Sequence, residues 1–392
     1  MNNVAEIKNN CCGCHSCEQV CSVGAIRFQE SAEGFFYPVV DEGKCISCGL
    51  CLKKCPANEP VYEGLSQKGY AAYFNNTDVL RKSSSGGMFS ALATEVLENG
   101  GVVCGCAEEK PGQVFHKIIN SIEDLKFLQG SKYVESDMSA VYSEVKENLK
   151  SGKVVLFSGT PCQVAGVKKF TGNPGNLITT DIICHGVPSR NLYNAYLDWF
   201  GKKNGGIVKE YSFRSKEKHD WSLTYRAVVE KGKKDKVYEA IGSLDPYYHH
   251  FLRGYNYRES CYVCKYACPE RCGDITLGDF WGIENVAPDF YNCNGVSAVL
   301  LNSSKGEKLW EFLAGKVTTK QVDVSEIVKH NGQLNKPTQR PEVRDFIYKE
   351  FNENGVPFIA KKYKDKREFI FDSVRNLLPN RTRQKMKRIL KG

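Results

Sequence analysis

Cysteine is the residue type with the most evident chemistry in this sequence of 392 residues. There are 18 cysteines, and nine of them lie between positions 11 and 55. Eight of the nine form two runs with the same C-x2-C-x2-C-x3-C spacing: Cys11, Cys14, Cys17 and Cys21, then Cys45, Cys48, Cys51 and Cys55. This spacing is typical of bacterial ferredoxins with two 4Fe-4S clusters, in which the fourth cysteine of each run ligates the other cluster.

The repeat therefore predicts two ligand sets. One cluster is expected on Cys11, Cys14, Cys17 and Cys55, and the other on Cys45, Cys48, Cys51 and Cys21. The alternative is a structural zinc module, which usually takes two short cysteine pairs rather than four cysteines in a row. Ser22 stands where a proline is usual after the first run, and Cys12 is an extra cysteine that we predict to be a non-ligand.

Four further cysteines lie at positions that could bind a ligand. Cys162 and Cys184 each follow a predicted buried strand and precede a predicted helix, at the sheet edge where open α/β folds bind ligands. A helix N-terminus also favours the thiolate form. Cys261 and Cys264 form a C-x2-C pair that could equally serve zinc. Each of the two single cysteines is also compatible with an inert position in the core.

The elements that would position these residues alternate between strands and helices. Buried strands are predicted at 153–157, 177–183 and 274–277, and helices at 88–97, 141–149 and 191–200, which together indicate an α/β arrangement. Thr160 suits a helix N-cap and Pro161 the first helical position. A polar, lysine-rich segment at 207–240 is predicted to form a hairpin.

Composition places the chain among globular proteins, since 41% of residues are hydrophobic and 25% are charged. No apolar run approaches the roughly 20 residues needed to cross a bilayer. The N-terminus also lacks a basic start followed by an apolar stretch, so we expect a cytoplasmic protein. A reducing cytosol would leave these cysteines as ligands, nucleophiles or core residues rather than as disulfides.

The net charge of +9 lies in the C-terminal segment. Residues 361–392 hold 12 Lys and Arg against 3 Asp and Glu, and the remaining chain is neutral, which argues against a nucleic-acid-binding protein. The segment is predicted to form an amphipathic basic helix that contacts an anionic membrane, with a solvated run of charges as the alternative. Its apolar residues are Phe369, Ile370, Phe371, Val374, Leu377 and Leu378, followed after Pro379 by Arg381, Arg383, Lys385, Lys387 and Arg388.

Several motifs occur in the order found in one known family. They are Ser85-Gly86-Gly87-Met88-Phe89-Ser90, Gly130-Ser131-Lys132-Tyr133-Val134, Gly159-Thr160-Pro161-Cys162-Gln163, Cys184-His185-Gly186-Val187-Pro188, the pair Cys261 and Cys264, and the run from Gly273 to Gly282. Over residues 1 to about 345 the chain resembles the family of coenzyme F420 hydrogenase/dehydrogenase beta subunits, in the form with an N-terminal two-cluster ferredoxin domain.

The resemblance implies an α/β core that binds FAD and carries a third 4Fe-4S cluster on Cys162, Cys184, Cys261 and Cys264. Cys268 and Cys272 depart from the family pattern, so a local set of Cys261, Cys264, Cys268 and Cys272 remains a rival.

For the flavin, the loop Ser85-Gly86-Gly87 could offer backbone N–H groups to a pyrophosphate, although it is not a G-x-G-x-x-G motif and could be an ordinary helix start. Further predicted contacts with the flavin or its substrate are Lys132, Tyr133, Thr160 and Trp281. Proton-supplying candidates are His185, Lys132 and Asp279. The alternatives are a solvated loop for Lys132 and Tyr133, a cap and packing role for Asp279 and Trp281, and a structural turn for His185.

We therefore expect a fold of mixed α+β and α/β class in four parts. These are a two-cluster ferredoxin domain at 1–62, an N-terminal beta-subunit domain with the flavin loop at 63–150, an α/β domain with the third cluster at 151–345, and a basic helical tail at 346–392. The expected function is that of an iron-sulfur flavoprotein oxidoreductase, which passes electrons between three 4Fe-4S clusters and FAD. The organic substrate is unidentified, and the redox partner could be ferredoxin, a nicotinamide or a deazaflavin. The alternative is an electron-transfer subunit without a substrate of its own. A homo-oligomer is also compatible with the sequence.

Overall fold

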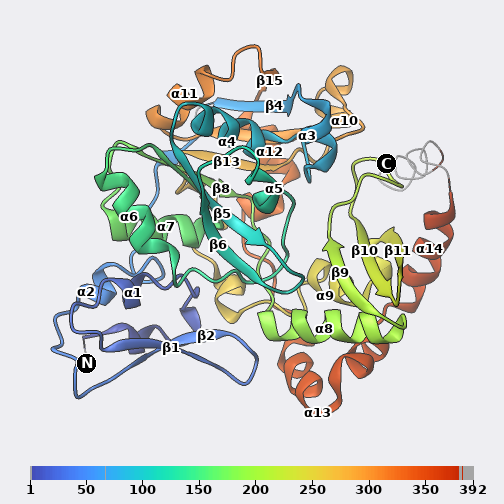
Figure 1. The fold of residues 1–392 in the computed structure, drawn as a ribbon, viewed down its shortest axis with the longest axis horizontal. Coiled ribbons are helices and arrows are strands. Elements are labelled where there is room, and N and C mark those ends of the chain that lie inside the picture. Colours follow the sequence, from blue (N-terminus) through green and yellow to red (C-terminus); the bar gives the residue numbers. More distant parts are fainter. Residues whose placement is uncertain (1, 67, 379–381, 383–392) are drawn as a thin grey trace.

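A computed structural model describes residues 2–66, 68–378 and 382. Its N-terminal part is a small module that contains both cysteine runs (Figure 1, lower left). The module consists of η1 (Val4–Asn10), α1 (Ser16–Gln19), β1 (Ile26–Glu30), β2 (Phe36–Val40) and α2 (Leu50–Lys53). β1 and β2 pair antiparallel, with Ile26 opposite Val40.

The two cysteine runs fold alike. His15 and Gly49 occupy equivalent positions just before α1 and α2, and both adopt left-handed backbone angles, with φ of 61° and 71°. Each thus turns the chain so that the next cysteine lies in a short helix. The predicted ferredoxin-like part of the fold is confirmed by this repeat of structure.

The centre of the molecule is one eight-stranded sheet in the order β15-β4-β14-β13-β8-β7-β5-β6. Its strands are β4 (Lys68–Phe74), β5 (Val102–Glu108), β6 (Val114–Ile119), β7 (Val155–Gly159), β8 (Leu177–Ile182), β13 (Ile275–Asp279), β14 (Ser297–Leu301) and β15 (Val317–Val322). The four neighbours β5, β7, β8 and β13 run parallel, and all other pairs in the sheet are antiparallel. A short second ladder joins β3 (Gly64–Leu65) to β12 (Glu270–Arg271).

Several helices accompany this sheet, and the helices predicted at 88–97 and 141–149 are among them. They are α3 (Thr77–Lys82), α4 (Met88–Glu98), α5 (Leu125–Leu128), α6 (Val141–Lys150), α7 (Pro161–Thr171), α10 (Ile283–Val286), α11 (Ser304–Glu311) and α12 (Val324–His330), with 3-10 turns η4 (Pro288–Phe290) and η5 (Gly332–Leu334). α7 starts as the sequence predicts, since Thr160 and Gln163 form a capping box and Pro161 is the first helical residue. Strand β7 is buried on both faces, as expected for the interior of a parallel sheet.

A third part packs beside the sheet (Figure 1, right and bottom). It comprises α8 (Arg190–Lys203), β9 (Ile207–Ser212), β10 (Thr224–Lys231), β11 (Lys234–Ile241), η2 (Gly242–Leu244), α9 (Pro246–Leu252), η3 (Glu259–Val263), α13 (Arg344–Lys362) and α14 (Lys366–Leu377). β9, β10 and β11 form an antiparallel sheet, so the segment at 207–240 has one strand more than the predicted hairpin. Its core is rich in tyrosine, and includes Tyr193, Tyr196 and Tyr247.

Two predicted boundaries fall inside structural units. Strands from 63–150 and from 151–345 pair within the same eight-stranded sheet, so the boundary between these segments does not separate two sheets. α13 packs against α8 through buried Ile347, Tyr348 and Phe351. Residues 346–362 therefore belong to the core rather than to a tail, whereas the helix predicted around 369–378 is present as α14. The basic run from Arg381 to Arg388 lies outside the described residues. In the described part of the chain, no helix is both long and apolar enough to span a bilayer.

Candidate metal and cofactor sites

A small cavity in the ferredoxin module is lined by one of the predicted ligand sets, namely Cys21, Cys45, Cys48 and Cys51. The backbone N–H of Ala25 donates to Cys21 Sγ at 3.2 Å. The Asn3 side-chain amide donates to Cys45 Sγ at 3.9 Å. Hydrogen bonds of this kind to ligand sulfurs are among the features that set the reduction potential of an iron-sulfur cluster.

The other predicted ligand set of the module is buried. Cys11, Cys14, Cys17 and Cys55 are each less than a tenth exposed. Burial raises the pKa of the Cys17 thiol, and the neighbouring Cys11 and Cys55 raise it further. Four thiols that interact at such close range suit an iron-sulfur cluster, which binds thiolate.

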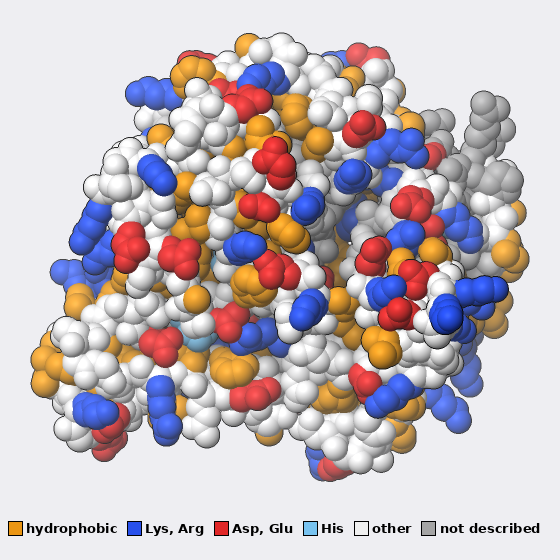
Figure 2. All heavy atoms as spheres, viewed as in Figure 1, with side chains coloured by type: hydrophobic (Ala, Val, Ile, Leu, Met, Phe, Trp, Pro, Cys, Tyr) orange, Lys and Arg blue, Asp and Glu red, His pale blue; other side chains and the backbone are white. Residues whose placement is uncertain are grey.

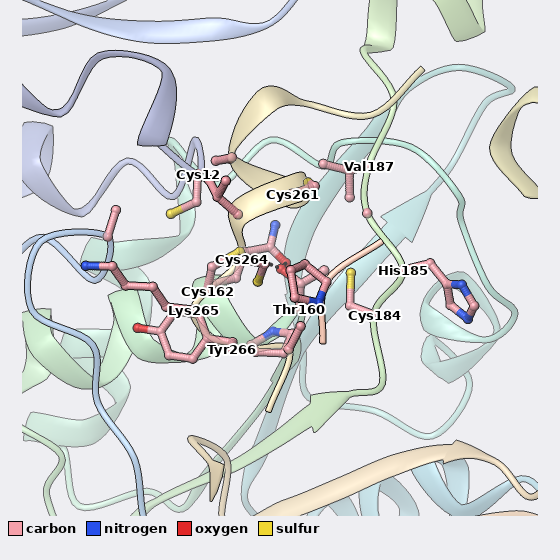
Figure 3. A pocket seen from close by; sticks show the side chains of 18 of the residues that line it. Cys12, Thr160, Cys162, Cys184, His185, Val187, Cys261, Cys264, Lys265 and Tyr266 are labelled. Carbon is pink, nitrogen blue, oxygen red and sulfur yellow. Dashed lines mark hydrogen bonds between the residues drawn. The ribbon is translucent and has the colours of Figure 1, made fainter. Parts of the chain in front are cut away.

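A larger cavity, of about 260 Å³, lies between this module and the edge of the eight-stranded sheet. Cys162, Cys184, Cys261 and Cys264 all line it (Figure 3). Cys162 is in the first turn of α7 and Cys184 follows β8, so two neighbouring parallel strands deliver one cysteine each. Cys261 lies in η3, and Cys264 directly follows it.

The loop that contributes Cys261 and Cys264 is hydrogen-bonded to the sheet at its C-terminal end. Arg271 donates to the Asp181 carboxylate on β8 at 3.1 Å, and both residues are buried. The second oxygen of Asp181 accepts from the backbone N–H groups of Cys272 and Gly273, at 3.2 and 3.0 Å. This network fixes the loop against β8, whose end carries Cys184.

The rival cysteines of this loop point elsewhere. Cys272 is fully buried, and its thiol lies 3.1 Å from the Pro161 carbonyl oxygen. The Cys268 thiol lies 3.3 Å from the carbonyls of Lys265 and Glu270. Neither lines the cavity, so the structure brings together the dispersed set and not the local one.

When no metal is bound, the cysteine thiols of the cavity are protonated near neutral pH. Burial raises the pKa of Cys184 and Cys261, and raises that of Cys264 to about 11. A metal cluster would displace these protons, as metals do when they bind cysteine. Within the described ranges, no three Cys, His, Asp or Glu side chains are placed to hold a single metal ion. The four thiols instead surround a space, and this arrangement fits a cluster.

The ferredoxin module is locked to the rest of the chain at its first cysteine run. Arg258, which is fully buried, donates to the Cys11 carbonyl and to the Glu135 carboxylate, each at 2.6 Å, and its guanidinium lies over the Tyr37 ring. A Cβ added at Gly13 would lie 2.5 Å from a Glu135 oxygen. Only glycine fits there, because the module approaches the core so closely.

The predicted flavin loop packs onto its own sheet. The Gly86 N–H donates to the Ser297 hydroxyl, and a Cβ at Gly86 would lie 2.3 Å from the Ala72 carbonyl oxygen. The Ser85 hydroxyl donates to the Val296 carbonyl. Gly87 is the left-handed N-cap of α4, with φ of 76°. The loop therefore needs glycine to contact β4 and β14.

Lys132 and Thr160 also have structural partners. The Lys132 ammonium group donates to the carbonyls of Cys106, Phe127 and Gln129 at 2.8–3.2 Å. Burial lowers its pKa. The Thr160 hydroxyl lies 3.2 Å from Cys162 Sγ, next to the cavity thiols. The Lys132 side chain thus stabilises the loop in which it lies. Thr160 lines the cysteine cavity.

The remaining predicted cofactor residues gather around a buried arginine that sequence analysis did not single out. Arg214 makes two hydrogen bonds to the Asp279 carboxylate, at 2.7 and 2.9 Å, and one to the Tyr133 hydroxyl at 3.3 Å. Asp279 also accepts from the indole N–H of Trp221, which stacks on Trp281 with ring centroids 5.3 Å apart. We refer to Arg214, Asp279, Tyr133, Trp221 and Trp281 as the Arg214 group.

His185 links the Arg214 group to the cysteine cavity. Its ring points away from the cavity thiols although it follows Cys184 directly (Figure 3). Burial lowers the pKa of His185, while the nearby Asp279 raises it. Arg214 holds the pKa of the Asp279 carboxyl below its usual value. Asp279 is therefore ionised near neutral pH, and His185 is mostly uncharged.

Comparison with known proteins identifies three matching family models. Residues 10–58 match a 4Fe-4S dicluster domain. Residues 69–143 match the N-terminal model of the coenzyme F420 hydrogenase/dehydrogenase beta subunit, and residues 152–325 match the C-terminal model.

Two curated proteins and one solved structure show related sequences. The coenzyme F420-dependent sulfite reductase of Methanocaldococcus jannaschii is 28% identical over 167 residues, which are 41% of this chain and 25% of that protein. The F component of the F(420)H(2) dehydrogenase of Methanosarcina mazei is 23% identical over 42% of this chain and 49% of its own. The match thus spans half or less of either relative. A chain of the F420-reducing NiFe hydrogenase complex from Methanosarcina barkeri is 18% identical, with 71% of this chain and 97% of that chain covered at a TM-score of 0.45.

Proposed function

Because the chain belongs to the family of coenzyme F420 hydrogenase/dehydrogenase beta subunits and carries a 4Fe-4S dicluster domain, we propose that it is an iron-sulfur flavoprotein oxidoreductase. The observation that carries the proposal is the cavity lined by Cys162, Cys184, Cys261 and Cys264. It directly adjoins the first ferredoxin run, since Cys12 and Gly13 also line it. Thiols for a third cluster thus lie beside those for the first.

We assign ligands as the sequence predicts. Bound 4Fe-4S clusters carry single electrons, and a bound FAD couples them to a two-electron change in an organic substrate. The two ferredoxin sets and the cavity set would hold three clusters. The set around Cys45 is the most accessible, because Cys48 is exposed, and the set around Cys11 adjoins Cys12 and Gly13, which line the cavity. The order of the sites therefore leads from the surface towards the sheet edge.

The Arg214 group is the proposed neighbourhood of the flavin and its substrate. It offers stacked aromatic rings and a charged pair, and both members of that pair act on the pKa of His185, which lines the cavity. Of the three proton-supplying candidates, His185 is the one we favour, because its uncharged ring can take up a proton and then pass it on. Asp279 is paired with Arg214, and the Lys132 ammonium group is committed to three carbonyls.

An electron-transfer subunit without its own substrate is the second proposal. It is favoured by the match to a protein that is named as one component of a dehydrogenase. In either case a redox partner is required, with ferredoxin, a nicotinamide or the deazaflavin as candidates. Activity of the purified chain with a small-molecule acceptor would distinguish the two. A chain that turns over only with a second protein would support the electron-transfer role.

Anaerobic purification with iron, sulfide and flavin analysis tests the cofactor content. We expect one FAD and about twelve irons per chain, because three clusters of four are proposed. About eight irons with a full complement of flavin would contradict the third cluster. A protein with the expected iron but without flavin would contradict the flavoprotein assignment.

The ligand set is tested by single substitutions. Cys162→Ala and Cys184→Ala should each remove about four irons and uncouple flavin reduction from the ferredoxin clusters. Cys268→Ala and Cys272→Ala are matched controls from the same region and should do neither. Loss of iron in the controls, with no effect at Cys162 and Cys184, would place the cluster in the local loop instead.

A membrane contact through α14 is a further proposal. The helix presents an apolar face to solvent: Leu377 is 83% exposed, Ile370 66% and Val374 56%. Figure 2 shows apolar atoms at the right-hand edge, where α14 lies in Figure 1, while the rest of this face carries interspersed charges of both signs. The basic run that follows in the sequence would supply the attraction to anionic lipid.

A further inference from the structure

A line of hydrogen bonds leads from the Cys162 sulfur into the core, and the proposed function makes no use of it. The Thr160 hydroxyl lies 3.2 Å from the Cys162 sulfur, and both side chains line the cavity (Figure 3). The same hydroxyl lies 3.0 Å from the side-chain oxygen of Gln163. From Gln163 the line continues through Ser136 to His116, with two contacts of 2.9 Å between buried side chains.

The direction of these hydrogen bonds follows from His116. Burial lowers the pKa of His116 to about 4, so its ring is neutral near pH 7 and carries one N–H. That N–H is on Nε2, because Nε2 lies 3.2 Å from the Ser158 carbonyl oxygen, which can only accept. Nδ1 therefore accepts from the Ser136 hydroxyl, and the Ser136 oxygen accepts in turn from the Gln163 amide nitrogen.

Gln163 is thus held with its side-chain oxygen towards Thr160. This oxygen accepts from the Thr160 backbone N–H at 3.0 Å. An amide oxygen cannot donate, so the Thr160 hydroxyl can only donate to Gln163. The single hydrogen of this hydroxyl has two acceptors within reach, the Gln163 oxygen at 3.0 Å and the Cys162 sulfur at 3.2 Å.

The charge on the sulfur decides between these two acceptors. The sulfur of a protonated cysteine is a weak acceptor, so without metal the Thr160 hydrogen favours the Gln163 oxygen. Cysteine binds metal as the thiolate, and hydrogen bonds to an ionised acceptor are roughly twice as strong as neutral ones. The hydrogen then turns to Cys162. Gln163 keeps the Thr160 backbone N–H, so its oxygen is not left unpaired.

We infer that Thr160 is a positioning residue for the third cluster, whose hydroxyl donates to the Cys162 sulfur in the cluster-loaded protein and raises the reduction potential there. A hydrogen bond to a ligand sulfur stabilises the more negative, reduced cluster. A higher potential makes this site a better acceptor of electrons from the adjoining ferredoxin module. The inference rests on the proposed function, because it requires a cluster on Cys162.

Redox titration followed by EPR spectroscopy tests this role on the full-length, cluster-loaded protein. The signal that is lost in Cys184→Ala identifies the third cluster. Thr160→Val has nearly the same shape but no hydroxyl, so it should keep about twelve irons and shift this signal alone to a lower potential. Thr160→Ser keeps a rotatable O–H and should restore the wild-type potential.

Gln163→Leu tests the competition between the two acceptors. It removes the rival acceptor and keeps the Thr160 hydroxyl, so the potential should not fall below that of the wild type. Gln163→Leu and Thr160→Val both disrupt the capping box of α7, so a weakened helix start would lower the potential in both. Thr180→Val is the matched control. The buried Thr180 hydroxyl on β8 has no hydrogen-bond partner among the described residues, and its removal should leave the potentials unchanged.

Several results would overturn the inference. Unchanged potentials in Thr160→Val would show that the hydroxyl does not act on the cluster, and a serine variant that behaves like valine would reduce Thr160 to packing. A lower potential in Gln163→Leu would assign the shift to the helix start. Loss of about four irons in Thr160→Val would make the residue necessary for assembly rather than for the potential. A wild-type protein with about eight irons would instead overturn the proposed function, and the inference with it.

Discussion

The ferredoxin module and the cysteine cavity beside the sheet use the same ligand type but obtain it differently. In the module, the eight cysteines that are predicted ligands lie between positions 11 and 55, within short loops and single-turn helices. In the cavity, the four cysteines range from position 162 to 264, and β7, β8 and a loop held by Arg271 bring them together. The module thus brings its ligands together locally, whereas the cavity depends on the whole sheet.

The two regions also differ in how many of their core residues are predicted metal ligands. The buried core of the module consists of Val4, Cys17, Ile26, Cys51 and Cys55, so three of its five members are predicted ligands. The sheet is covered by large clusters that consist mainly of buried aliphatic and aromatic residues. A domain of about 60 residues buries a small share of its surface and is therefore only marginally stable without further links. We therefore expect bound clusters to stabilise the module more than the sheet.

Removal of iron should produce the largest difference between the module and the sheet. Anaerobic treatment with a chelator and oxidant should unfold the module, because metal binding supplies much of its folding free energy, and leave the eight-stranded sheet folded. Hydrogen exchange should show loss of protection in β1 and β2 with protection kept in β7 and β8. Equal protection of both regions in the iron-free protein would show that the module folds without its clusters.

Substitution of Arg258 should break the contact between the two regions. Arg258→Met removes one partner of a buried ion pair and leaves Glu135 charged in the interior, at a cost of about 3–5 kcal/mol in unfolding free energy. Urea denaturation measures this loss. Arg340→Met is the control, since Arg340 pairs with Glu259 and Asp345 in a partly exposed position and should cost about 0–1 kcal/mol. Similar costs for the two variants would show that Arg258 does not join the regions.

The contrast between the regions also explains what could be predicted from the sequence. The cysteine runs and the start of α7 at Thr160 are local patterns, so their spacing was sufficient. The pair of Arg214 and Asp279 was missed because its members are distant in sequence and Arg214 lies in a lysine-rich segment without a motif. The burial of α13 could have been predicted from the sequence, because Ile347, Tyr348 and Phe351 recur at helical spacing. The basic residues that follow led instead to the prediction of a tail.

Lowering the pH should reduce the unfolding free energy of the sheet through protonation of His116 on β6. Burial lowers the pKa of His116 from 6.5 to about 4, and its ring is bonded to the Ser136 hydroxyl and near the Ser158 carbonyl. The unfolded chain takes up a proton near pH 6.5 and the folded chain only near pH 4. The contribution of this group is therefore full above pH 6.5 and is lost as the pH falls towards 4.

At pH 5 this loss should be about 2 kcal/mol relative to neutral pH. His116→Gln lacks the group, so the difference in unfolding free energy between the two proteins should change by that amount between pH 7 and pH 5. Chemical denaturation at both pH values provides the measurement. A difference that does not vary with pH would mean that the pKa of His116 is the same in the folded and unfolded states.

The smallest effect is expected at α14, which lies far from both sets of cysteines. The face that packs inward is polar: Asp372 accepts a hydrogen bond from Ser243, and Asn376 from the backbone N–H of Ile241. The outward face is apolar, which is the arrangement of a helix that lies on a membrane surface. Substitutions on the outward face therefore test membrane contact without disturbing the attachment of the helix.

Val374→Gln together with Leu377→Gln should weaken sedimentation with vesicles that contain anionic lipid, because each removes apolar surface from the interface. Iron and flavin content should not change, since α14 contacts neither cysteine set. Ile207→Gln on β9 is the matched control, an equally exposed apolar residue on another element, at 72% exposed. It should sediment like the wild type. If the α14 variant also sediments like the wild type, the apolar face does not contact the membrane, and the basic segment is a solvated run of charges.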